Sequence, residues 1–297
     1  MPSSASTIPD GDLVWTRMIG TSAYFEQAQG VAADTTGNIY ICGGTDQVLG
    51  RGYVGPAKKE DAWFAKYDPD GVLIWVRQFG SAGNDNCDAV AVDNEDNILL
   101  VGTTSGRLTG PVAPKQSPNI WFAKYTAEGK RAWARQISAF VGSTPDIATD
   151  ADGNVLVSGN RYRSSISGLV GGGYDAFVAK YSPAGKRMWI REVFGIGGTD
   201  FSYGVAADPS GNVLLTGMVE VLPRPADGTR LSDGFVAKYS PVGSQLWRHR
   251  LSTEGGENGT AVAADQLGDI YVTGNTTGAF TVFYGWADPF LAKLPAD

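Results

Sequence analysis

Four carboxylates stand at the same position in four copies of a recurring sequence unit. They are Glu26, Asp85, Asp200 and Glu257, and the third copy has Gly142 there instead. Each stands at the head of a segment expected to be a strand, so a closed arrangement of the copies would place all four around one channel mouth. There they could hold a cation, or accept hydrogen bonds from sugar hydroxyls or an amine. In the other interpretation, each carboxylate accepts hydrogen bonds from N–H groups of the Gly-rich turn before it.

A second group of candidate binding residues lies where the copies differ from one another. These residues are Tyr53, Arg161, Tyr162, Tyr284 and Trp286. Aromatic rings beside arginine on a concave rim can stack on sugars or other planar ligands. Phe280, in the same segment as the last two, could instead serve only to anchor its own loop. A binding site is therefore expected in these variable segments.

The single histidine argues against most hydrolytic machinery. His249 lies in a predicted outer strand, where the other copies have arginine, so neither a Ser-His-Asp apparatus nor a zinc centre is expected. No glycine-rich phosphate loop stands between a strand and a helix. Carboxylate chemistry remains, as in a glycosidase or lyase with two acids facing each other across the channel. The sequence assigns no residue a catalytic role and predicts no metal site.

No cofactor is predicted, although calcium stays open as a minor alternative. The segment DADGN (150–154) resembles the opening of a calcium-binding loop, but the other copies lack its second acidic residue. Three copies share the pattern Asp-x-x-Gly-Asn. This pattern is typical of a hairpin in which glycine adopts a positive φ and aspartate bonds the turn backbone. Hairpin capping is therefore the favoured interpretation.

The repeat itself extends over nearly the whole chain, because tryptophan and lysine recur at intervals of 55–60 residues. The tryptophans are Trp15, Trp75, Trp133, Trp189 and Trp247, and the lysines are Lys66, Lys124, Lys180, Lys238 and Lys293. A fixed period of this size indicates a repeat architecture and gives these residues a structural role. Each unit holds four short runs of β-branched and aromatic residues between Gly, Pro, Asn and Asp, which is typical of strands.

We therefore predict an all-β fold, a five-bladed β-propeller with four-stranded antiparallel blades. The chain begins with a fourth strand, DLVWTRMIG (12–20), and ends with a third, DPFLAKL (288–294). The N-terminal strand would complete the last blade as its outer strand and close the ring, which removes two exposed sheet edges. A single domain over 1–297 is expected. Its blades cover approximately 21–80, 81–138, 139–195, 196–251, and 252–294 with 12–20.

Strand order determines which connections share a face of the propeller. The short hairpins lie together on one face, and the long, dissimilar second-to-third connections lie on the other, where binding is expected. On each first strand, the position two residues before the aspartate of the following turn is alanine in all five copies. The position two residues earlier, on the same face of the strand, holds a small residue in four copies and Asp146 in the third. Such a stripe indicates close contact at the axis or between blades.

Composition narrows the partners and the compartment. The net charge of −7 argues against nucleic acid and anionic membranes as partners, and no apolar run is long enough for membrane insertion. The start, MPSSASTIPDGD, does not read as a signal peptide.

Cys42 and Cys87 lack metal-binding spacing. Two buried thiols are the favoured interpretation, and a disulfide stays open for an exported protein.

The repeated segments resemble the bacterial β-propeller repeat known as the SBBP repeat. Its pattern matches GVAADPSGNVLLTG (204–217) and YDAFVAKYSPAGKRMWIR (174–191), and the resemblance extends from Asp12 to Leu294. It implies an extracellular or periplasmic bacterial protein, often a non-catalytic module. We expect a binding or scaffold module that presents its long-loop face to a glycan, small molecule or protein. The alternative is a carboxylate-dependent enzyme, glycosidase- or lyase-like, acting on a small molecule or glycan at the channel mouth.

Overall fold

Every regular element in the described part of the chain is a β-strand, which confirms the predicted all-β class. The computed structural model describes residues 11–21, 25–49, 59–109, 118–137, 144–163, 173–193, 198–221, 232–280 and 285–296. Their strands form five antiparallel sheets, as five blades require. Within these residues no helix has the length and apolar character needed to cross a bilayer.

Four sheets have four strands each and the last has three, in sequential order. The first contains β1 (Glu26–Ala33), β2 (Ile39–Thr45), β3 (Asp61–Tyr67) and β4 (Leu73–Phe79). The second contains β5 (Asp85–Val92), β6 (Ile98–Thr104), β7 (Asn119–Tyr125) and β8 (Arg131–Ile137). The third contains β9 (Asp146–Thr149), β10 (Val155–Arg163), β11 (Gly173–Tyr181) and β12 (Arg187–Val193). The fourth contains β13 (Phe201–Ala207), β14 (Val213–Glu220), β15 (Ser232–Tyr239) and β16 (Gln245–Leu251). The last contains β17 (Glu257–Ala264), β18 (Ile270–Thr276) and β19 (Asp288–Leu294).

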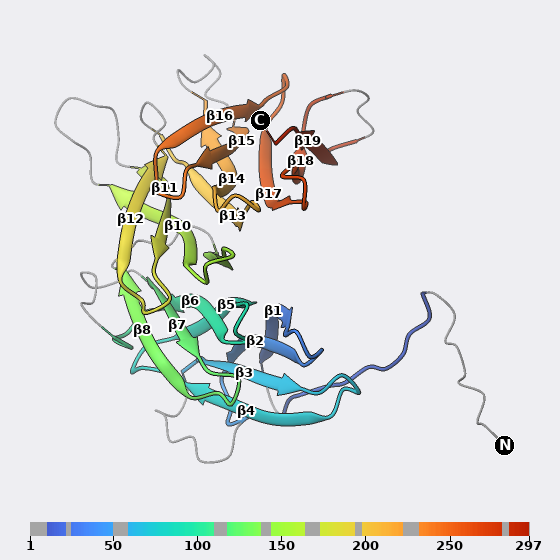
Figure 1. The fold of residues 1–297 in the computed structure, drawn as a ribbon. Coiled ribbons are helices and arrows are strands. Elements are labelled where there is room, and N and C mark those ends of the chain that lie inside the picture. The colour runs from blue at the N-terminus through green and yellow to red at the C-terminus, as the bar shows by residue number, and fades with distance from the viewer. Residues whose placement is uncertain are drawn as a thin grey trace.

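The sheets stand side by side in an arc (Figure 1), with their first strands on the inner side and β4, β8, β12 and β16 on the outer side. The first strands of successive sheets pack against one another. The hairpins that join first to second and third to fourth strands lie on one face. The ends of the second strands and the starts of the third strands lie on the other, and this face is called the loop face below.

Close packing between sheets explains the stripe of small residues on the first strands. A Cβ added to Gly30 would lie 2.9 Å from the backbone nitrogen of Val90 in the next sheet. A Cβ added to Gly204 would lie 3.0 Å from the Cα of Ala261. Such distances are shorter than real side chains tolerate, so only the smallest residues fit where neighbouring first strands touch. The stripe therefore marks contact between sheets.

The recurring tryptophans connect each sheet to the next, in line with the structural role predicted for them. Trp133 Nε1 donates to the Pro183 carbonyl at 2.9 Å, and Arg135 Nε donates to the Gly185 carbonyl at 2.9 Å. The Arg135 guanidinium also lies 5.5 Å from the centre of the Trp133 ring. Trp189 and Arg191 make the same contacts to the fourth sheet.

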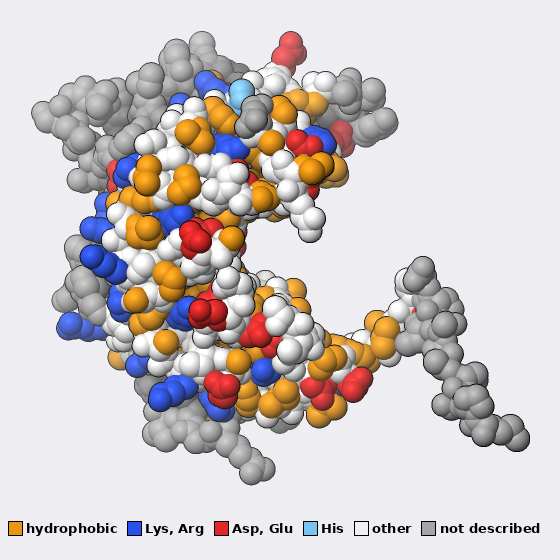
Figure 2. All heavy atoms as spheres, viewed as in Figure 1, with side chains coloured by type: hydrophobic (Ala, Val, Ile, Leu, Met, Phe, Trp, Pro, Cys, Tyr) orange, Lys and Arg blue, Asp and Glu red, His pale blue; other side chains and the backbone are white. Residues whose placement is uncertain are grey.

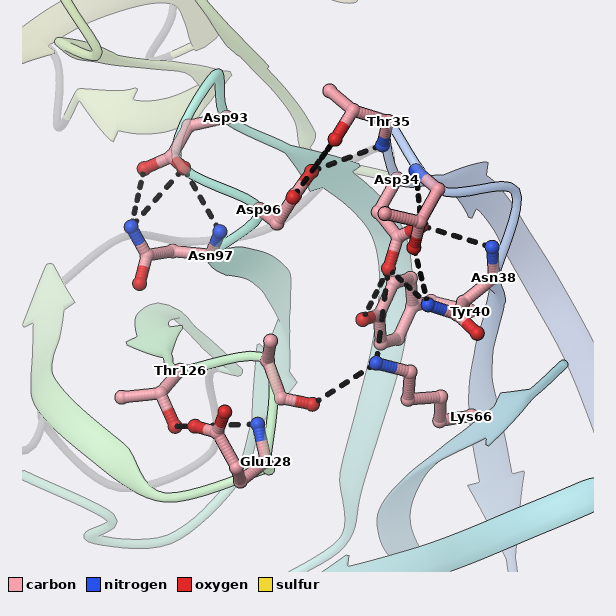
Figure 3. A network of polar contacts seen from close by, with 12 residues as sticks. Asp34, Thr35, Asn38, Tyr40, Lys66, Asp93, Asp96, Asn97, Thr126 and Glu128 are labelled. Atoms are coloured by element: carbon pink, nitrogen blue, oxygen red, sulfur yellow. Dashed lines mark hydrogen bonds and ion pairs between the residues drawn. The ribbon is translucent and has the colours of Figure 1, made fainter.

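Each recurring lysine forms an ion pair with an aspartate of its own sheet. The Nζ–Oδ2 distances are 3.7 Å for Lys66–Asp34, 2.7 Å for Lys124–Asp93, 2.7 Å for Lys180–Asp150, 3.1 Å for Lys238–Asp208 and 2.5 Å for Lys293–Asp269. Figure 3 shows the first of these networks, in which Tyr40 also donates to Asp34. Burial alone would raise the pKa of Asp34, but hydrogen bonds from Asn38, Thr36 and Tyr40 outweigh it and lower that pKa well below its usual value.

The same networks join neighbouring sheets. Lys66 Nζ donates to the Ala127 carbonyl of the second sheet at 3.4 Å. Asp96 accepts hydrogen bonds from the backbone N–H and hydroxyl of Thr35 in the first sheet (Figure 3). Asp96 has a φ of 60° and stands where the other copies of this turn have glycine. The unfavourable backbone of this residue is therefore offset by bonds that hold two sheets together.

The arc is open in this structure. Residues 12–20 form no strand, and the last sheet ends at β19 without a fourth strand. Figures 1 and 2 show the first and last sheets facing each other across an opening. Val31 is 70% exposed although its counterparts Val90 and Val205 are buried, and Leu291 is 75% exposed although Phe64, at the same position, is buried. The two sheets at the opening thus expose surfaces that the other sheets bury against their neighbours.

The N-terminal segment nevertheless lies where an outer strand belongs. Trp15 Nε1 donates to the Pro69 carbonyl at 3.3 Å, and Arg17 Nε donates to the Gly71 carbonyl at 2.9 Å. These are the contacts that Trp133 and Arg135 of the second sheet make with the third sheet. Residues 11–21 therefore occupy the position of an outer strand that would precede the first sheet, while its predicted pairing with β19 is not formed.

Candidate functional site

The four carboxylates predicted at the channel mouth are engaged by neighbouring polar groups. Asp85 and Glu257 are fully buried. Asp85 accepts hydrogen bonds from the backbone N–H and hydroxyl of Ser81, at 2.5 and 2.9 Å. Glu257 accepts from the backbone N–H of Thr253 at 2.9 Å, from the Thr253 hydroxyl, and from the Thr276 hydroxyl at 2.8 Å. These two therefore cap the connection that precedes their strand.

Of the remaining two, Glu26 has similar surroundings, whereas Asp200 is bonded by a residue of the neighbouring strand β14. Glu26 Oε1 accepts from the Thr21 backbone N–H at 3.1 Å and from its hydroxyl at 2.6 Å. Asp200 is buried and accepts from the backbone N–H of Glu220 at 3.2 Å. This geometry is the one expected of carboxylates that satisfy backbone N–H groups. Their service as ligand contacts stays a prediction.

Two non-repeating candidates, Arg161 and Tyr162, lie at the loop-face end of β10 and lead into an aromatic cluster. The cluster consists of Tyr162, Tyr174, Phe201 and Tyr203. The ring centres of Tyr162 and Tyr174 are 5.6 Å apart, those of Tyr174 and Phe201 are 5.5 Å apart, and those of Phe201 and Tyr203 are 6.2 Å apart. Tyr162 is 41% exposed and the other three are partly buried. The aromatic cluster thus runs between the third and fourth sheets at the loop face.

Of the aromatic cluster, the sequence singled out only Tyr162, and the other three residues were not identified as candidates. Phe201 and Tyr203 lie on an inner strand at positions where the second sheet has Asn86 and Asp88. That break in the repeat was the available signal. Arg161, which is exposed, pairs with Glu192 across the sheet at 3.1 Å. Because successive side chains of a strand point to opposite faces, Arg161 lies on the face of the third sheet opposite to Tyr162 and the aromatic cluster.

The same inner-strand positions are polar in the first two sheets. Asn86 Nδ2 donates to the side-chain oxygens of Gln29 and Asp88, each at 2.9 Å. Burial raises the pKa of Asp88 to about 7, and the nearby Glu60 carboxylate adds to this rise. Asn86 Oδ1 and Asp88 Oδ2 are buried and lack hydrogen-bond partners among the described residues. A protonatable carboxyl therefore lies in a polar cluster near the inner rim.

A shallow cavity of about 470 Å³ lies at the loop face of the last sheet. It is lined by Thr253, Glu254, Gly255, Thr277, Gly278 and Ala279. Trp286 nearby in the sequence is 99% exposed, whereas Phe280 packs against Phe290 with ring centres 5.0 Å apart. Phe280 therefore anchors its own loop, as one of the two interpretations held.

Other sequence-predicted residues lie outside the site or outside the described residues. Tyr53, Tyr284 and Gly142 fall in segments that the structure does not describe. His249 is exposed on β16, with its ring centre 5.0 Å from that of Trp247. Asp150, the first residue of the calcium-like segment, accepts from the Asp152 and Asn154 N–H groups and pairs with Lys180. Within the described ranges, no three His, Cys, Asp or Glu residues lie together as metal ligands would.

Several known proteins are similar to parts of this chain. A WD repeat-containing protein of Acanthamoeba polyphaga mimivirus, itself uncharacterised, is 22% identical over 93% of this chain and 26% of its own length. The regulatory protein FlaEY of Caulobacter vibrioides is 28% identical over 50% of this chain and 17% of its own length. This chain thus spans about a quarter or less of these relatives.

Among solved structures, polysaccharide lyase Uly1 is 10% identical, with a TM-score of 0.46 over 90% of this chain and 57% of the lyase. The β-propeller domain of the trilobed protease from Pyrococcus furiosus, described as having an open velcro topology, is 9% identical. Its TM-score is 0.38 over 93% of this chain and 84% of that domain.

The model of the SBBP family, described as a β-propeller repeat, matches four regions of the chain. They are residues 14–49, 74–108, 189–218 and 246–281. Each matched region begins near a recurring tryptophan and extends through the first two strands of the next sheet. The resemblance seen in the sequence is thereby confirmed, because four regions of the chain match the SBBP β-propeller repeat.

Proposed function

We propose that this chain is a non-catalytic binding module that presents its loop face to a glycan. The observation that supports this proposal is the partly exposed aromatic cluster of Tyr162, Tyr174, Phe201 and Tyr203, which interrupts the repeat. Sugar rings expose C–H faces that stack on aromatic rings, while their hydroxyls need donors and acceptors at the edge. The tyrosine hydroxyls of the cluster provide those groups.

The experiment compares glycan binding by the full chain and by matched variants. Tyr162→Ala is expected to weaken binding about tenfold, because removal of one stacking ring costs about 1.4 kcal/mol. Met188→Ala, a change at an exposed position on the outer strand β12, is the control and should bind as tightly as the parent. A glycan array followed by calorimetry provides the measurement. Equal affinity of the parent and Tyr162→Ala for every bound glycan would refute the assigned site.

A carboxylate-dependent enzyme acting on a small molecule or glycan is the second candidate. Asp88 favours it, because a carboxyl with a pKa of about 7 is suited to proton transfer at neutral pH. The ligands found on the array are therefore also tested for turnover by the parent and by Asp88→Asn. Turnover that disappears in Asp88→Asn would replace the binding module with the enzyme. Binding without turnover in both proteins supports the module.

We further infer that residues 12–20 close the ring as the outer strand of the last blade. This inference is supported by the outer-strand position of Trp15 and by the exposure of Val31 and Leu291 on the two sheets that would meet. Closure would satisfy the free edge of β19, whose unpaired backbone groups otherwise invite association. It would also bury both exposed surfaces.

Hydrogen exchange tests the closure. In the full chain, the amides of β19 that point away from β18 should be protected, because residues 12–20 accept their hydrogen bonds. Deletion of residues 1–21 should remove this protection while leaving that of β7, in the second sheet, unchanged. Rapid exchange of those β19 amides in the full chain would show that the arc stays open.

An extracellular or periplasmic location in a bacterium belongs to the same proposal. Its support is the family of the repeat and the proposed glycan ligand, which are typical of exported modules. The net charge of −7 also suits a partner that is neither nucleic acid nor an anionic membrane.

A further inference from the structure

The two cysteines of this chain lie on opposite sides of one contact between sheets. Cys42 belongs to β2 in the first sheet and Cys87 to β5 in the second, and both are completely buried in the same apolar cluster. The two side chains are close enough for the Cys42 thiol to raise the pKa of the Cys87 thiol. Cys87 Sγ also lies 3.6 Å from the Ala89 carbonyl oxygen. The chain has no other cysteine.

The internal repeat shows that these two positions face each other between sheets. Thr216 and Gly259 stand at the same two positions where the fourth sheet meets the last. A Cβ added to Gly259 would lie 2.1 Å from the Thr216 hydroxyl oxygen. Ser158 and Ser202 hold these positions between the third and fourth sheets, and both are completely buried. This pair of positions therefore lies close together across the contact between sheets, and here both residues are cysteines.

We propose that Cys42 and Cys87 form a disulfide that links the first and second sheets. In this step each thiol gives up its hydrogen and one S–S bond forms. The two electrons and two protons pass to a small-molecule disulfide, such as oxidised glutathione, which is reduced to two thiols. The proposal rests on the contact between the two sheets, and depends neither on glycan binding nor on closure of the ring.

The surroundings of the sulfurs determine when the bond can form. Burial, together with the neighbouring Cys42 thiol, raises the pKa of the Cys87 thiol well above its usual value. The thiolate is the species that attacks a disulfide, and no oxidant reaches a sulfur that is fully buried. Oxidation is therefore expected while the sheets are still apart, during folding, and to be slow once the protein is folded.

The test refolds the reduced, denatured full chain with oxidised glutathione or with reduced glutathione alone. Alkylation in denaturant followed by mass spectrometry then counts the free thiols. The oxidised sample should take up no alkyl groups and be about 2 Da lighter. It should also unfold at a temperature at least about 5 °C higher, because the bond constrains a loop of roughly 45 residues in the unfolded chain. Folded protein given the same oxidant should keep both thiols for much longer.

Matched variants keep the outcome interpretable. Cys42→Val introduces the residue that the second sheet has at this position, and Cys87→Ser introduces the residue of the fourth sheet. Each variant should unfold at the same temperature after either treatment. Two alkylated thiols after oxidative refolding would overturn the proposal. Disulfide-linked dimers without an internal disulfide would overturn it as well.

Discussion

Replacement of Lys180 by methionine is expected to lower the free energy of unfolding by about 3 kcal/mol. Lys180 Nζ lies 2.7 Å from Asp150 Oδ2, and both side chains are almost completely buried. The methionine side chain replaces most of the buried aliphatic part of Lys180, but it leaves the Asp150 carboxylate without its counter-charge. Loss of one partner of a buried ion pair costs far more than loss of an exposed one, because the remaining charge stays desolvated. Urea unfolding at neutral pH measures the difference.

Lys293 provides a matched control for this prediction. It occupies the same position in the last sheet and pairs with Asp269, but its side chain is 54% exposed. In a background lacking residues 1–21, which keeps the arc open, Lys293→Met should therefore leave the urea midpoint close to that of its own parent. The double variant Lys180→Met with Asp150→Asn should recover part of the lost stability, since no buried charge remains. Equal destabilisation by Lys180→Met and Lys293→Met would contradict the proposed role of burial.

Replacement of Asp146 by asparagine is expected to stabilise the protein at pH 8 by about 3 kcal/mol. Asp146 Oδ2 accepts a hydrogen bond from the backbone N–H of Val205 in the next sheet at 2.9 Å. Burial raises the pKa of this carboxyl from 3.8 to about 6, while hydrogen bonds from Val205 and Ile147 oppose the rise. Asparagine can accept the same hydrogen bond without a charge.

The pH dependence of this difference has a definite sign. A carboxyl whose pKa is higher in the folded state stabilises the fold fully below its unfolded pKa, and this contribution is lost as the pH rises through the folded value. The parent should therefore lose stability relative to Asp146→Asn between about pH 4 and pH 7. Unfolding curves of both proteins across this range provide the measurement. A constant difference from pH 4 to pH 8 would show that Asp146 titrates normally.

The architecture was predictable because it follows from local chemistry repeated along the chain. The Asp-x-x-Gly-Asn turns need a positive φ, and Gly37, Gly153 and Gly211 adopt it as predicted. The period of lysine and aspartate was also visible in the sequence. Their ion pairs were not, because strand pairing brings Lys180 close to Asp150 from 30 residues away. Spacing shows that two residues recur, but only the folded sheet shows that they meet.

The candidate site was less predictable because it depends on contacts between sheets. Tyr162 stands out in the sequence as an exception to the repeat, whereas Tyr174 is only the last residue of the long connection 160–174. Phe201 and Tyr203 alternate along β13 with buried residues and look like core in the sequence. Asp146 was visible as an exception among small residues, but its bond to Val205 crosses to another sheet. These relations depend on how neighbouring sheets pack, which a linear pattern does not contain.

The offset between repeats and sheets has an evolutionary consequence. The match at 74–108 covers β4 of one sheet with β5 and β6 of the next, and the matches at 189–218 and 246–281 have the same offset. A gene duplication that copies one such unit delivers parts of two sheets, and neither part is stable by itself. The new copy is retained only when its neighbours complete it. The number of blades can therefore change by whole units. At each junction, the new unit presents the same contact surface as the unit from which it was copied, so it already fits its neighbour.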